Sequence, residues 1–380
     1  MRIAIFGLTI SSSWGNNHAT LWRGLGKALV ELGHEFIFFE RNVPRYSGMR
    51  DWTSLPSSMG DSELVLYSDW STIEARARRE LLTCDAAIVS SYCFDAQAAT
   101  DTILDVQHPL AVFYDLDTPA TLETLRSGKQ VPYIPWRGLG DFDLVLSYSG
   151  GAALEALRSD LCAHRVRALY GHVDPDAHHR VHAIPRYRAA LSWLGPYSAD
   201  RQAMLEELFV TPARLRPDQR FLIAGAQYPE HFPWSPNVSF VDHVPPLQHA
   251  AFFCSSRLTL NVTREPMARM GWCPTLRLFE AAACGAAVLS DEWCGLDDFY
   301  TPGEQVLVAR YCDDTLAALE LSDAQLQSIG RAARERTLDE HTSLHRARQL
   351  IHYLEELQAR SWPLPHQHPQ RIRHGANVIM

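Results

Sequence analysis

Residues 270–293, MGWCPTLRLFEAAACGAAVLSDEW, decide how the rest of the sequence is interpreted. A Gly-Trp-Cys-Pro turn precedes a helical pattern with one apolar face, and Thr275 suits the N-cap of that helix. Gly285 is placed to end the helix, and the short apolar run 286–290 is typical of a buried parallel strand. The stretch therefore predicts a helix–strand unit of an α/β domain.

The start of this helix is a candidate phosphate site. Unpaired backbone N–H groups and the positive end of the helix dipole favour anions there. Arg277 adds a positive charge in the first turn, and Glu280 follows three residues later on the same side. This pair suits a nucleotide, with Arg277 on a phosphate and Glu280 accepting hydrogen bonds from the ribose hydroxyls. The spacing alone fits an ordinary Arg–Glu surface pair equally well.

Residues 275–293, TLRLFEAAACGAAVLSDEW, resemble the donor-binding motif of glycosyltransferases with the GT-B fold. The chain is similar to the spore-maturation CgeB-like group, which is related to the retaining family 4, from Ile3 to about Leu350. The resemblance implies an α/β protein with two Rossmann-like doubly wound domains that face a cleft, and it assigns Glu280 to the donor ribose. Family 4 enzymes usually carry a second Glu eight residues earlier, where this chain has Trp272. The contact to the donor sugar and the stereochemistry of transfer therefore stay open.

The order of strands and helices along the chain also predicts two α/β domains. A strand at 2–7, a polar loop at 8–17 and a helix at 19–32 begin the first domain, and the same layout returns from Leu191. In chain order we expect an acceptor-binding domain at 1–172, a nucleotide-sugar-binding domain at 173–340, a helix crossing back to the first domain at 341–360 and a surface tail at 361–380.

Charge and composition narrow the possible partners. The net charge of -9 argues against nucleic acid, because proteins that bind it usually carry a basic patch. No apolar run approaches the roughly 18 residues that span a bilayer, and the chain starts with a strand instead of a signal peptide, so we expect a cytoplasmic protein. The eight cysteines form no C-x-x-C pair, which disfavours zinc and disulfides. Cys273, Cys284 and Cys294 are interpreted as small core residues.

The loop after the first strand, ISSSWGNNHAT, resembles the opening loop of the CgeB-like group and marks the expected acceptor side. His18 is either a structural histidine or a catalytic base, since imidazole titrates near neutral pH. The segment FYDLDTP, 113–119, also resembles this group. Its D-x-D spelling is not interpreted as a metal motif, because Asp117 fits a helix N-cap, although Asp115 or Asp117 is expected to orient the acceptor. The predicted acceptor-side residues are Ser13, Trp14, Gly15, His18 and Asp115, beside an irregular insertion at 43–70.

The second domain carries the expected donor site. The diphosphate leaving group is expected to be neutralised by Arg201, Arg264 or Arg277, together with backbone N–H groups. The predicted donor-binding residues are Gly195, Tyr197, Arg201, Gly225, His243, Val244, Thr263, Arg264, Gly271, Trp272, Pro274, Thr275, Arg277 and Glu280.

Residues 166–174 are interpreted as the crossing between the domains. His178, His179 and His182 follow it, and two readings are open for them. They suggest metal by their number, but no carboxylate or cysteine spacing supports a metal site, so a solvated linker is the preferred interpretation.

These patterns favour a hexosyltransferase-type glycosyltransferase that moves a sugar from a nucleotide sugar, preferably a UDP-sugar, to an unidentified acceptor. We expect no metal and no cofactor, and His18, Asp117 and Arg277 are the predicted catalytic residues. Two alternatives stay open. A sugar-nucleotide epimerase of the same fold would need acid–base residues at the sugar, and none stands out. A non-catalytic protein that binds a sugar nucleotide or a glycan is consistent with Trp272 in place of the second Glu.

Overall fold

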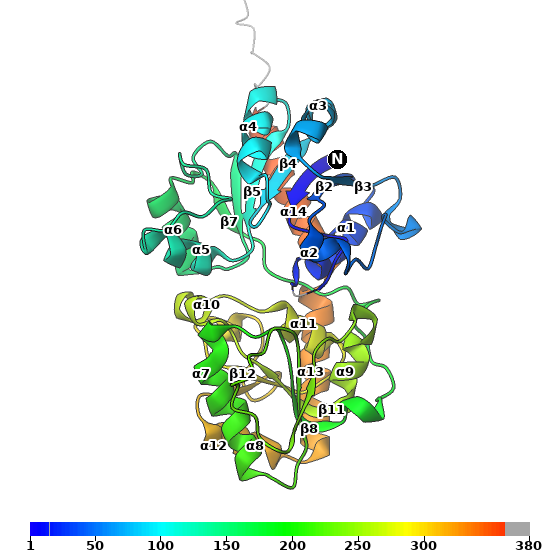
Figure 1. Ribbon diagram of the computed structural model, residues 1–380, viewed down its shortest axis with the longest axis vertical. Coiled ribbons are helices and arrows are strands. Elements are labelled where there is room, and N and C mark those ends of the chain that lie inside the picture. Colours follow the sequence, from blue (N-terminus) through cyan, green and yellow to red (C-terminus); the bar gives the residue numbers. More distant parts are fainter. Residues whose placement is uncertain (15, 362–380) are drawn as a thin grey trace, which may run out of the picture.

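The computed structural model describes residues 1–14 and 16–361, which form two α/β domains stacked along the long axis of the molecule (Figure 1). The first domain has a seven-stranded sheet with the order β3-β2-β1-β4-β5-β6-β7, and the second has a six-stranded sheet with the order β10-β9-β8-β11-β12-β13. All strand pairs are parallel. In each sheet the chain reverses its direction of winding beside the first strand, as in doubly wound folds. The two predicted doubly wound domains are confirmed.

The first domain alternates strands with helices. Its elements are β1 (Arg2–Gly7), α1 (His18–Glu31), β2 (Glu35–Arg41), α2 (Pro44–Ser47), β3 (Glu63–Tyr67), α3 (Trp70–Leu81), β4 (Ala86–Ser90), α4 (Ala96–Val106), β5 (Leu110–Asp115), α5 (Thr118–Arg126), β6 (Leu144–Ser147), α6 (Ala152–Leu161) and β7 (Val166–Ala168).

The second domain follows the same plan, and three helices, α12 to α14, come after its last strand. Its elements are β8 (Ala189–Leu194), α7 (Gln202–Leu205), a π-helical turn (Glu206–Val210), α8 (Thr211–Leu215), β9 (Phe221–Ala224), β10 (Val238–Val241), α9 (His249–Ser255), β11 (Ser256–Asn261), α10 (Glu265–Met270), α11 (Leu276–Ala283), β12 (Val288–Asp291), β13 (Leu307–Ala309), α12 (Cys312–Leu319), α13 (Asp323–Glu340) and α14 (Ser343–Ser361).

The central strands are buried on both faces, which explains why their sequences are apolar without alternation. In β1, Ala4 and Phe6 pack into a core shared with α3 and α4. Ile3 and Ile5 pack into the opposite core, which α1 and α14 complete. Two further cores lie on the two sides of the second sheet. Each domain is therefore a three-layer sandwich.

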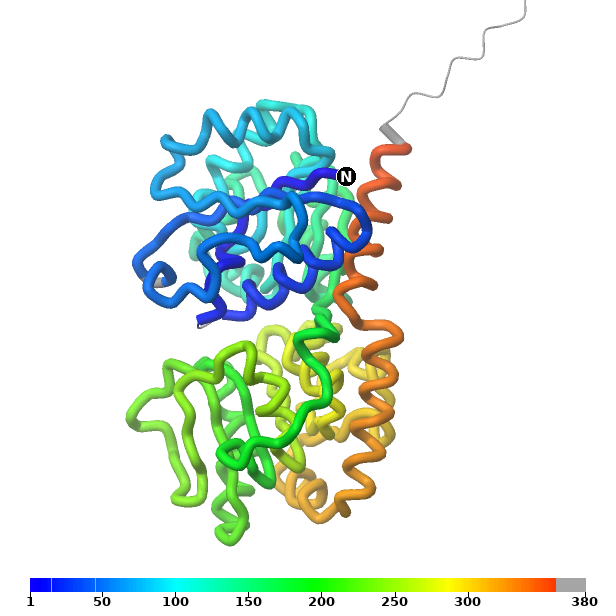
Figure 2. Tube along the Cα trace, turned by 90° about the vertical axis from the view of Figure 1, so that its right-hand side faces the viewer, coloured from blue at the N-terminus to red at the C-terminus, as the bar shows by residue number. Residues whose placement is uncertain are grey.

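Both connections between the domains lie on one side of the molecule (Figure 2). One is the segment from 169 to 188, which joins β7 to β8. The other is α14, which leaves the second domain after α13 and packs against α1 of the first. Val173 pairs with Thr342 where the two connections pass each other. This is the crossing-back helix that the sequence predicts at 341–360, observed at Ser343–Ser361.

Two sequence interpretations of the first domain are wrong. The supposedly irregular stretch 43–70 contains β3, an edge strand whose alternating sequence ELVLY buries Val65 and Tyr67 on one face. Residues 166–168 form β7 at the other edge of the sheet, so the crossing begins only after them. Both are short edge strands, which carry a weaker apolar signal than strands buried on two faces.

Other predictions concern individual positions. Cys273 and Cys284 are buried as predicted, whereas Cys294 is exposed, because it lies in the turn after β12 instead of on the helix. Gly15 and the tail beyond 361 lie outside the described residues. Within the part that the structure describes, no helix combines the length and the apolar sequence needed to cross a membrane.

The contact of α14 with the first domain gives a stability prediction. Leu354 is fully buried between α14 and α1, so Leu354→Ala should lower the free energy of unfolding by about 2–5 kcal/mol. Urea denaturation followed by circular dichroism measures the change. Glu355→Ala, exposed on the same helix, is the matched control and should shift stability by less than about 0.5 kcal/mol. Equal changes in the free energy of unfolding for the two variants would contradict a stabilising role for the packing of α14 against the first domain.

Candidate functional site

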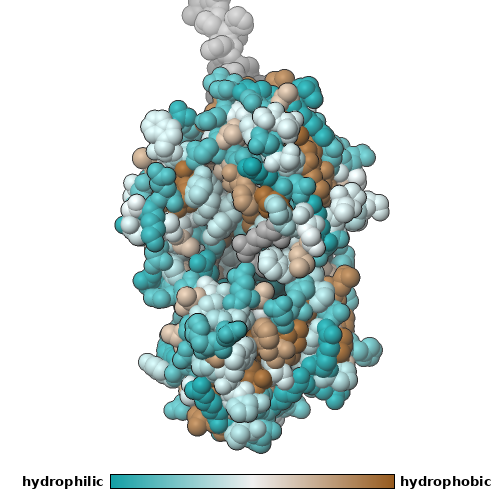
Figure 3. All heavy atoms as spheres, in the orientation of Figure 1, coloured by the Kyte–Doolittle hydropathy of each residue, from teal (hydrophilic) through white to brown (hydrophobic). Residues whose placement is uncertain are grey.

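A cavity of about 350 Å³ lies between the two domains. Loops at the carboxyl ends of β1, β5, β8 and β11 border it, which is where open α/β sheets bind ligands. On the face shown in Figure 3 the molecule is hollowed where the domains meet. The surface around the hollow is mostly hydrophilic. The lining residues are Leu8, Asn16, Asn17, His18, Leu21, Tyr46, Tyr92, Leu116, Asp117 and Tyr148 from the first domain, and Pro196, Tyr197, Ser198, Arg201, Arg264, Met267, Cys273, Thr275 and Leu276 from the second.

A buried carboxylate fixes the loop that follows β1. Glu40, at the end of β2, accepts hydrogen bonds from the backbone N–H groups of Ile10 at 2.8 Å and Ser11 at 3.0 Å. Its other oxygen accepts from the Ser11 hydroxyl at 2.5 Å, and Arg50 lies 3.8 Å away as its counter-charge. The loop is therefore anchored at its start, and it delivers residues 16–18 to the cavity.

His18 begins α1 and faces the cavity. Its ring stacks edge-on against Tyr92 at 5.4 Å, and its Nδ1 is buried without a hydrogen-bond partner. Burial lowers the pKa of His18 to about 4, although Asp117 opposes the shift. The imidazole is therefore neutral near pH 7 and has a lone pair available for a proton.

Asp117 takes part in a charge network across the cleft. Its Oδ2 accepts hydrogen bonds from the Tyr92 hydroxyl at 2.7 Å and from Nη1 of Arg264, in the second domain, at 3.1 Å. Nε of Arg264 also donates to Asp200 at 2.8 Å. The expectation that Asp117 caps a helix is corrected here: it occupies the N-cap position of α5, but its side chain makes no capping bond because Tyr92 and Arg264 hold the carboxylate.

Asp115 lies just below the cavity and is fully buried. Its Oδ1 accepts from the backbone N–H of Asp117 at 3.0 Å and from the Thr121 hydroxyl at 3.2 Å, whereas Oδ2 has no partner. Burial raises the pKa of Asp115 to about 7. The structure thus places it as a support of the Asp117 loop, outside the cavity lining.

Arg201 is the least compensated cation of the cavity. It is partly buried, and its buried Nε has no hydrogen-bond partner. Burial, followed by repulsion from Arg264, lowers the pKa of Arg201. Asp200 is engaged by Arg264 and Ser198. An anion in the cavity would relieve both the burial cost and the repulsion between the two guanidinium groups.

A smaller hollow of about 40 Å³ continues from the cavity into the second domain. It collects several predicted donor residues that the larger cavity does not contain. Its lining is Ser13, Asn16, Asn17, Thr20, Leu194, Gly195, Pro196, Gly225, Ala226, His243, Val244, His249 and Arg277.

Arg277 and Glu280 form the predicted i,i+3 pair on α11. It is not a surface pair, since only 1% of Glu280 is exposed. Nη2 of Arg277 also donates to Oδ1 of Asn17 in the first domain at 3.2 Å. Burial alone would raise the pKa of Glu280, but Arg277 and then His178 and His249 lower it to about 2. Arg277 lines the hollow whereas Glu280 does not, so Glu280 is reached from the hollow only past that side chain.

The interpretation of His178 as part of a solvated linker is wrong. His178 is 4% exposed and lies 3.7 Å from Glu280. The chain turns inward after Asp174, whose backbone carbonyl accepts from the N–H of His178. His179 and His182 are exposed, as predicted.

The remaining predicted residues lie around α11. Thr275 caps α11 through a hydrogen bond from the N–H of Leu278 and lines the cavity, and Pro274 is buried beside it. Thr263 is buried, and its N–H and hydroxyl donate to Asp291. Gly271 has φ +73°, and a side chain there would meet the carbonyl of Cys294.

Trp272 is absent from the linings of the cavity and the hollow. Its indole lies close to Gly151 and Gly295, and its Nε1 donates to Asp298 at 2.5 Å. The backbone carbonyl of Trp272 accepts from the N–H of Gly150 in the first domain at 2.8 Å. The structure therefore uses Trp272 to join the domains beside the cleft.

Comparison with known proteins agrees with this architecture. Residues 201–352 match the family described as Glycosyl transferase-like. No curated protein sequence matches the chain. The chain has the GT-B fold. The GT-B structures that it resembles include sucrose-phosphate synthase from Thermosynechococcus elongatus, with a TM-score of 0.69, 14% identity and coverage of 95% of this chain and 100% of that one.

Two further GT-B structures match over almost their whole length. HepE from Anabaena, solved in complex with UDP-glucose, has a TM-score of 0.64, 12% identity and coverage of 94% of this chain and 100% of its own. Trehalose 6-phosphate synthase from Burkholderia multivorans has a TM-score of 0.60, 11% identity and coverage of 95% and 99%. At these sequence identities the comparison establishes the GT-B fold but does not identify the substrates.

Sequence reasoning missed several residues of the GT-B cleft. Tyr92 and Asp200 hold Asp117 and Arg264, and Asn17 holds Arg277. Asn17 lies in the loop that the sequence places on the acceptor side, and Asp200 precedes the predicted Arg201. Their places next to predicted residues were the available signal, but the partner of each lies far away in the sequence.

The buried carboxyl of Asp115 gives a prediction about pH. Its folded-state pKa of about 7 exceeds its ordinary value of 3.8, so the folded state holds the proton more tightly. The contribution of Asp115 to stability is complete below about pH 4 and is lost as the pH rises to 7, with a span on the order of 4 kcal/mol. Asp115→Asn, which stays neutral, should therefore become more stable relative to the parent as the pH rises from 5 to 8.

Urea unfolding of both proteins at the two pH values measures this difference. Asp61→Asn, at an exposed site before β3, is the control and should keep a constant difference from the parent. A stability difference between Asp115→Asn and the parent that is the same at pH 5 and pH 8 would show that the carboxyl is ionised throughout this range.

Proposed function

We propose that this GT-B protein is a glycosyltransferase that moves a sugar from a nucleotide-sugar donor to an acceptor bound by the first domain. The observation that supports this proposal best is Arg201, a partly buried cation that faces the interdomain cavity with its buried Nε unpaired. A diphosphate supplies two or more negative oxygens for this pair. Charge that develops on the leaving diphosphate is best stabilised by cations already fixed in place. The matched Glycosyl transferase-like family supports this assignment.

The donor nucleotide is proposed to occupy the smaller hollow, with its diphosphate in the larger cavity. Gly195, Gly225 and Arg277 line the hollow, and Arg277 pairs with the buried Glu280. We propose a UDP-sugar as donor, in keeping with the UDP-glucose of the similar HepE structure. No metal ion is required in this proposal, because Arg201, Arg264 and Arg277 supply the positive charge.

The acceptor is proposed to enter over the first domain, where His18 is placed as the general base. The neutral imidazole of His18 can take the proton of an acceptor hydroxyl, and Asp117 stabilises the imidazolium that results. We further propose the hexosyltransferase type and membership of the CgeB-like group, from the motif at 275–293. A cytoplasmic location stays a prediction from the sequence.

One alternative has a specific observation in its favour. Trp272 stands where family 4 enzymes usually carry a Glu, and it does not line the cavity or the hollow, which suits a protein that only binds a sugar nucleotide or a glycan. The two functions differ in one measurable respect. An enzyme releases free nucleotide slowly even without acceptor, because water intercepts the sugar, whereas a binding protein does not.

Replacement of Arg201 tests the diphosphate site. Arg201→Ala should weaken UDP binding about 10- to 100-fold, since a charged hydrogen bond is worth about 1.5–3 kcal/mol. Titration calorimetry with UDP measures the affinity. Arg214→Ala, at an exposed arginine of α8, is the control and should bind UDP like the parent. Parental affinity in Arg201→Ala would move the diphosphate away from this cavity.

Replacement of His18 separates chemistry from donor binding. His18→Ala should keep the UDP affinity within a few-fold but lose most of the sugar transfer, because the donor contacts lie on the second domain. Acceptor-dependent product formation and calorimetry on one batch of protein provide both values. His164→Ala, at an exposed histidine of the first domain, should behave as the parent. Sugar transfer at the parental rate by His18→Ala would show that His18 is not the general base and that its loop has only a structural role.

A further inference from the structure

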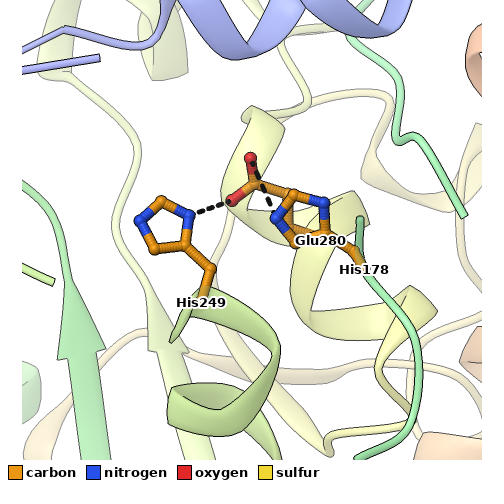
Figure 4. A group of neighbouring side chains, drawn as sticks. All are labelled: His178, His249 and Glu280. Carbon is orange, nitrogen blue, oxygen red and sulfur yellow. Dashed lines mark ion pairs between the residues drawn. The ribbon is translucent and has the colours of Figure 1, made fainter. Parts of the chain in front are cut away.

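Three buried side chains from three separate segments converge at the base of the smaller hollow (Figure 4). His178 comes from the connection between the domains, His249 is the first residue of α9, and Glu280 lies on α11. Each offers one ligand atom, and these atoms lie within 4.8 Å of one another. Two imidazoles and a carboxylate are typical ligands of zinc.

Three polar atoms of this cluster have no hydrogen-bond partner among the described residues of the protein. Both ring nitrogens of His178 and Oε1 of Glu280 are buried without a hydrogen-bond partner. The 3.7 Å between Nε2 of His178 and Oε1 of Glu280 is too long for a hydrogen bond. Each unsatisfied buried polar group costs about 1–3 kcal/mol. An occupant that bonds to these atoms would remove that cost.

The third ligand is oriented by its surroundings. Nε2 of His249 lies 3.1 Å from the carbonyl oxygen of Val244, which can only accept, so Nε2 carries the hydrogen. The lone pair of Nδ1 therefore faces the cluster, 4.0 Å from Oε2 of Glu280. A backbone carbonyl that fixes the outer nitrogen of an imidazole is the usual support of a metal-binding histidine.

We propose that His178, His249 and Glu280 form a binding site for a divalent transition metal ion, with Zn²⁺ as the fitting ion, in which the metal takes the place of the Arg277 guanidinium. Ligands of a tetrahedral zinc ion with bonds of about 2.0–2.1 Å lie about 3.4 Å apart. The three ligand atoms lie within 4.8 Å of one another, so the side chains must move closer together to reach this geometry. Mg²⁺ and Ca²⁺ are disfavoured because they prefer oxygen ligands.

Arg277 shows that a cation is accepted at this place. Its Nη1 lies 3.0 Å from Nδ1 of His249 and pairs with Oε2 of Glu280. Its Nη2 already donates to Asn17 of the first domain, so the guanidinium has a partner on the cleft side when it leaves the cluster. His249 and Arg277 both line the hollow, which gives the ion a path from the cleft.

Cobalt and zinc titrations of the full-length protein test the site. Co²⁺ should give the visible absorption of a four-coordinate ion at one equivalent per chain, and Zn²⁺ should remove it. His178→Ala and Glu280→Gln should lose this signal, while His179→Ala and His182→Ala, at the exposed histidines of the same segment, should retain it. Arg277→Ala should bind the metal at least ten-fold more tightly than the parent, because the competing cation is gone.

Two results would overturn the proposal. One is an unchanged cobalt spectrum in His178→Ala, with the variant shown to be folded by circular dichroism. The other is a metal affinity in Arg277→Ala no higher than that of the parent, which would leave Arg277 and Glu280 as a plain structural pair. Neither measurement depends on enzymatic activity.

A consequence for activity rests on the proposed function. If Glu280 holds the donor ribose, a metal ion on Glu280 and the donor compete, so Zn²⁺ should inhibit sugar transfer by the parent but not by His178→Ala. Metal binding without inhibition would contradict the role of Glu280 at the ribose, and it would leave the metal site itself standing.

Discussion

Buried carboxylates at the carboxyl ends of three strands hold the cleft of this protein in shape. Glu40 is the last residue but one of β2, Asp115 ends β5 and Asp291 ends β12, and each accepts at least one backbone N–H group of a nearby loop. Loop N–H groups in this position would otherwise be buried without partners. Burial disfavours the charged form of these carboxylates, and it raises the pKa of both Asp115 and Asp291 to about 7. The loops that carry His18, Asp117 and Arg264 depend on these three acceptors.

The charges that face the cleft are shared between partners on both domains. Arg264 serves Asp117 of the first domain and Asp200 of the second, while Arg277 serves Asn17 and Glu280. An anionic ligand must compete with these partners, and in doing so it releases contacts that join the domains. Because both connections lie on one side of the molecule, release on the cleft side permits a hinge motion about them. A ligand that competed for these two arginines would therefore also weaken contacts between the domains.

The two-domain fold could be predicted from the sequence because the signals for its strands and helices are local. The apolar run of β1, the N-cap at Thr275 and the glycine stop at Gly285 each lie within a few residues of the element that they define. The edge strand β3 was not predicted, because one of its faces is solvated and its apolar pattern is therefore weaker. The partners of the site residues could not be predicted, since Asp117 meets Arg264 over 147 positions of sequence. His178 shows the same limit: its polar neighbours suggested solvent, and only the fold brings it onto Glu280.

Trp272 joins the two domains beside the cleft. Its φ of +44° is unfavourable for a bulky residue and costs on the order of 1–2 kcal/mol. Three contacts offset this strain: its N–H donates to Cys294 at 2.7 Å, its carbonyl accepts from Gly150 and its indole N–H donates to Asp298. The surrounding glycines are required, because a Cβ at Gly151 or Gly295 would lie within 2.5 Å of the indole. An acidic side chain here would lose this packing between the domains, so Trp272 and its glycines form one structural unit.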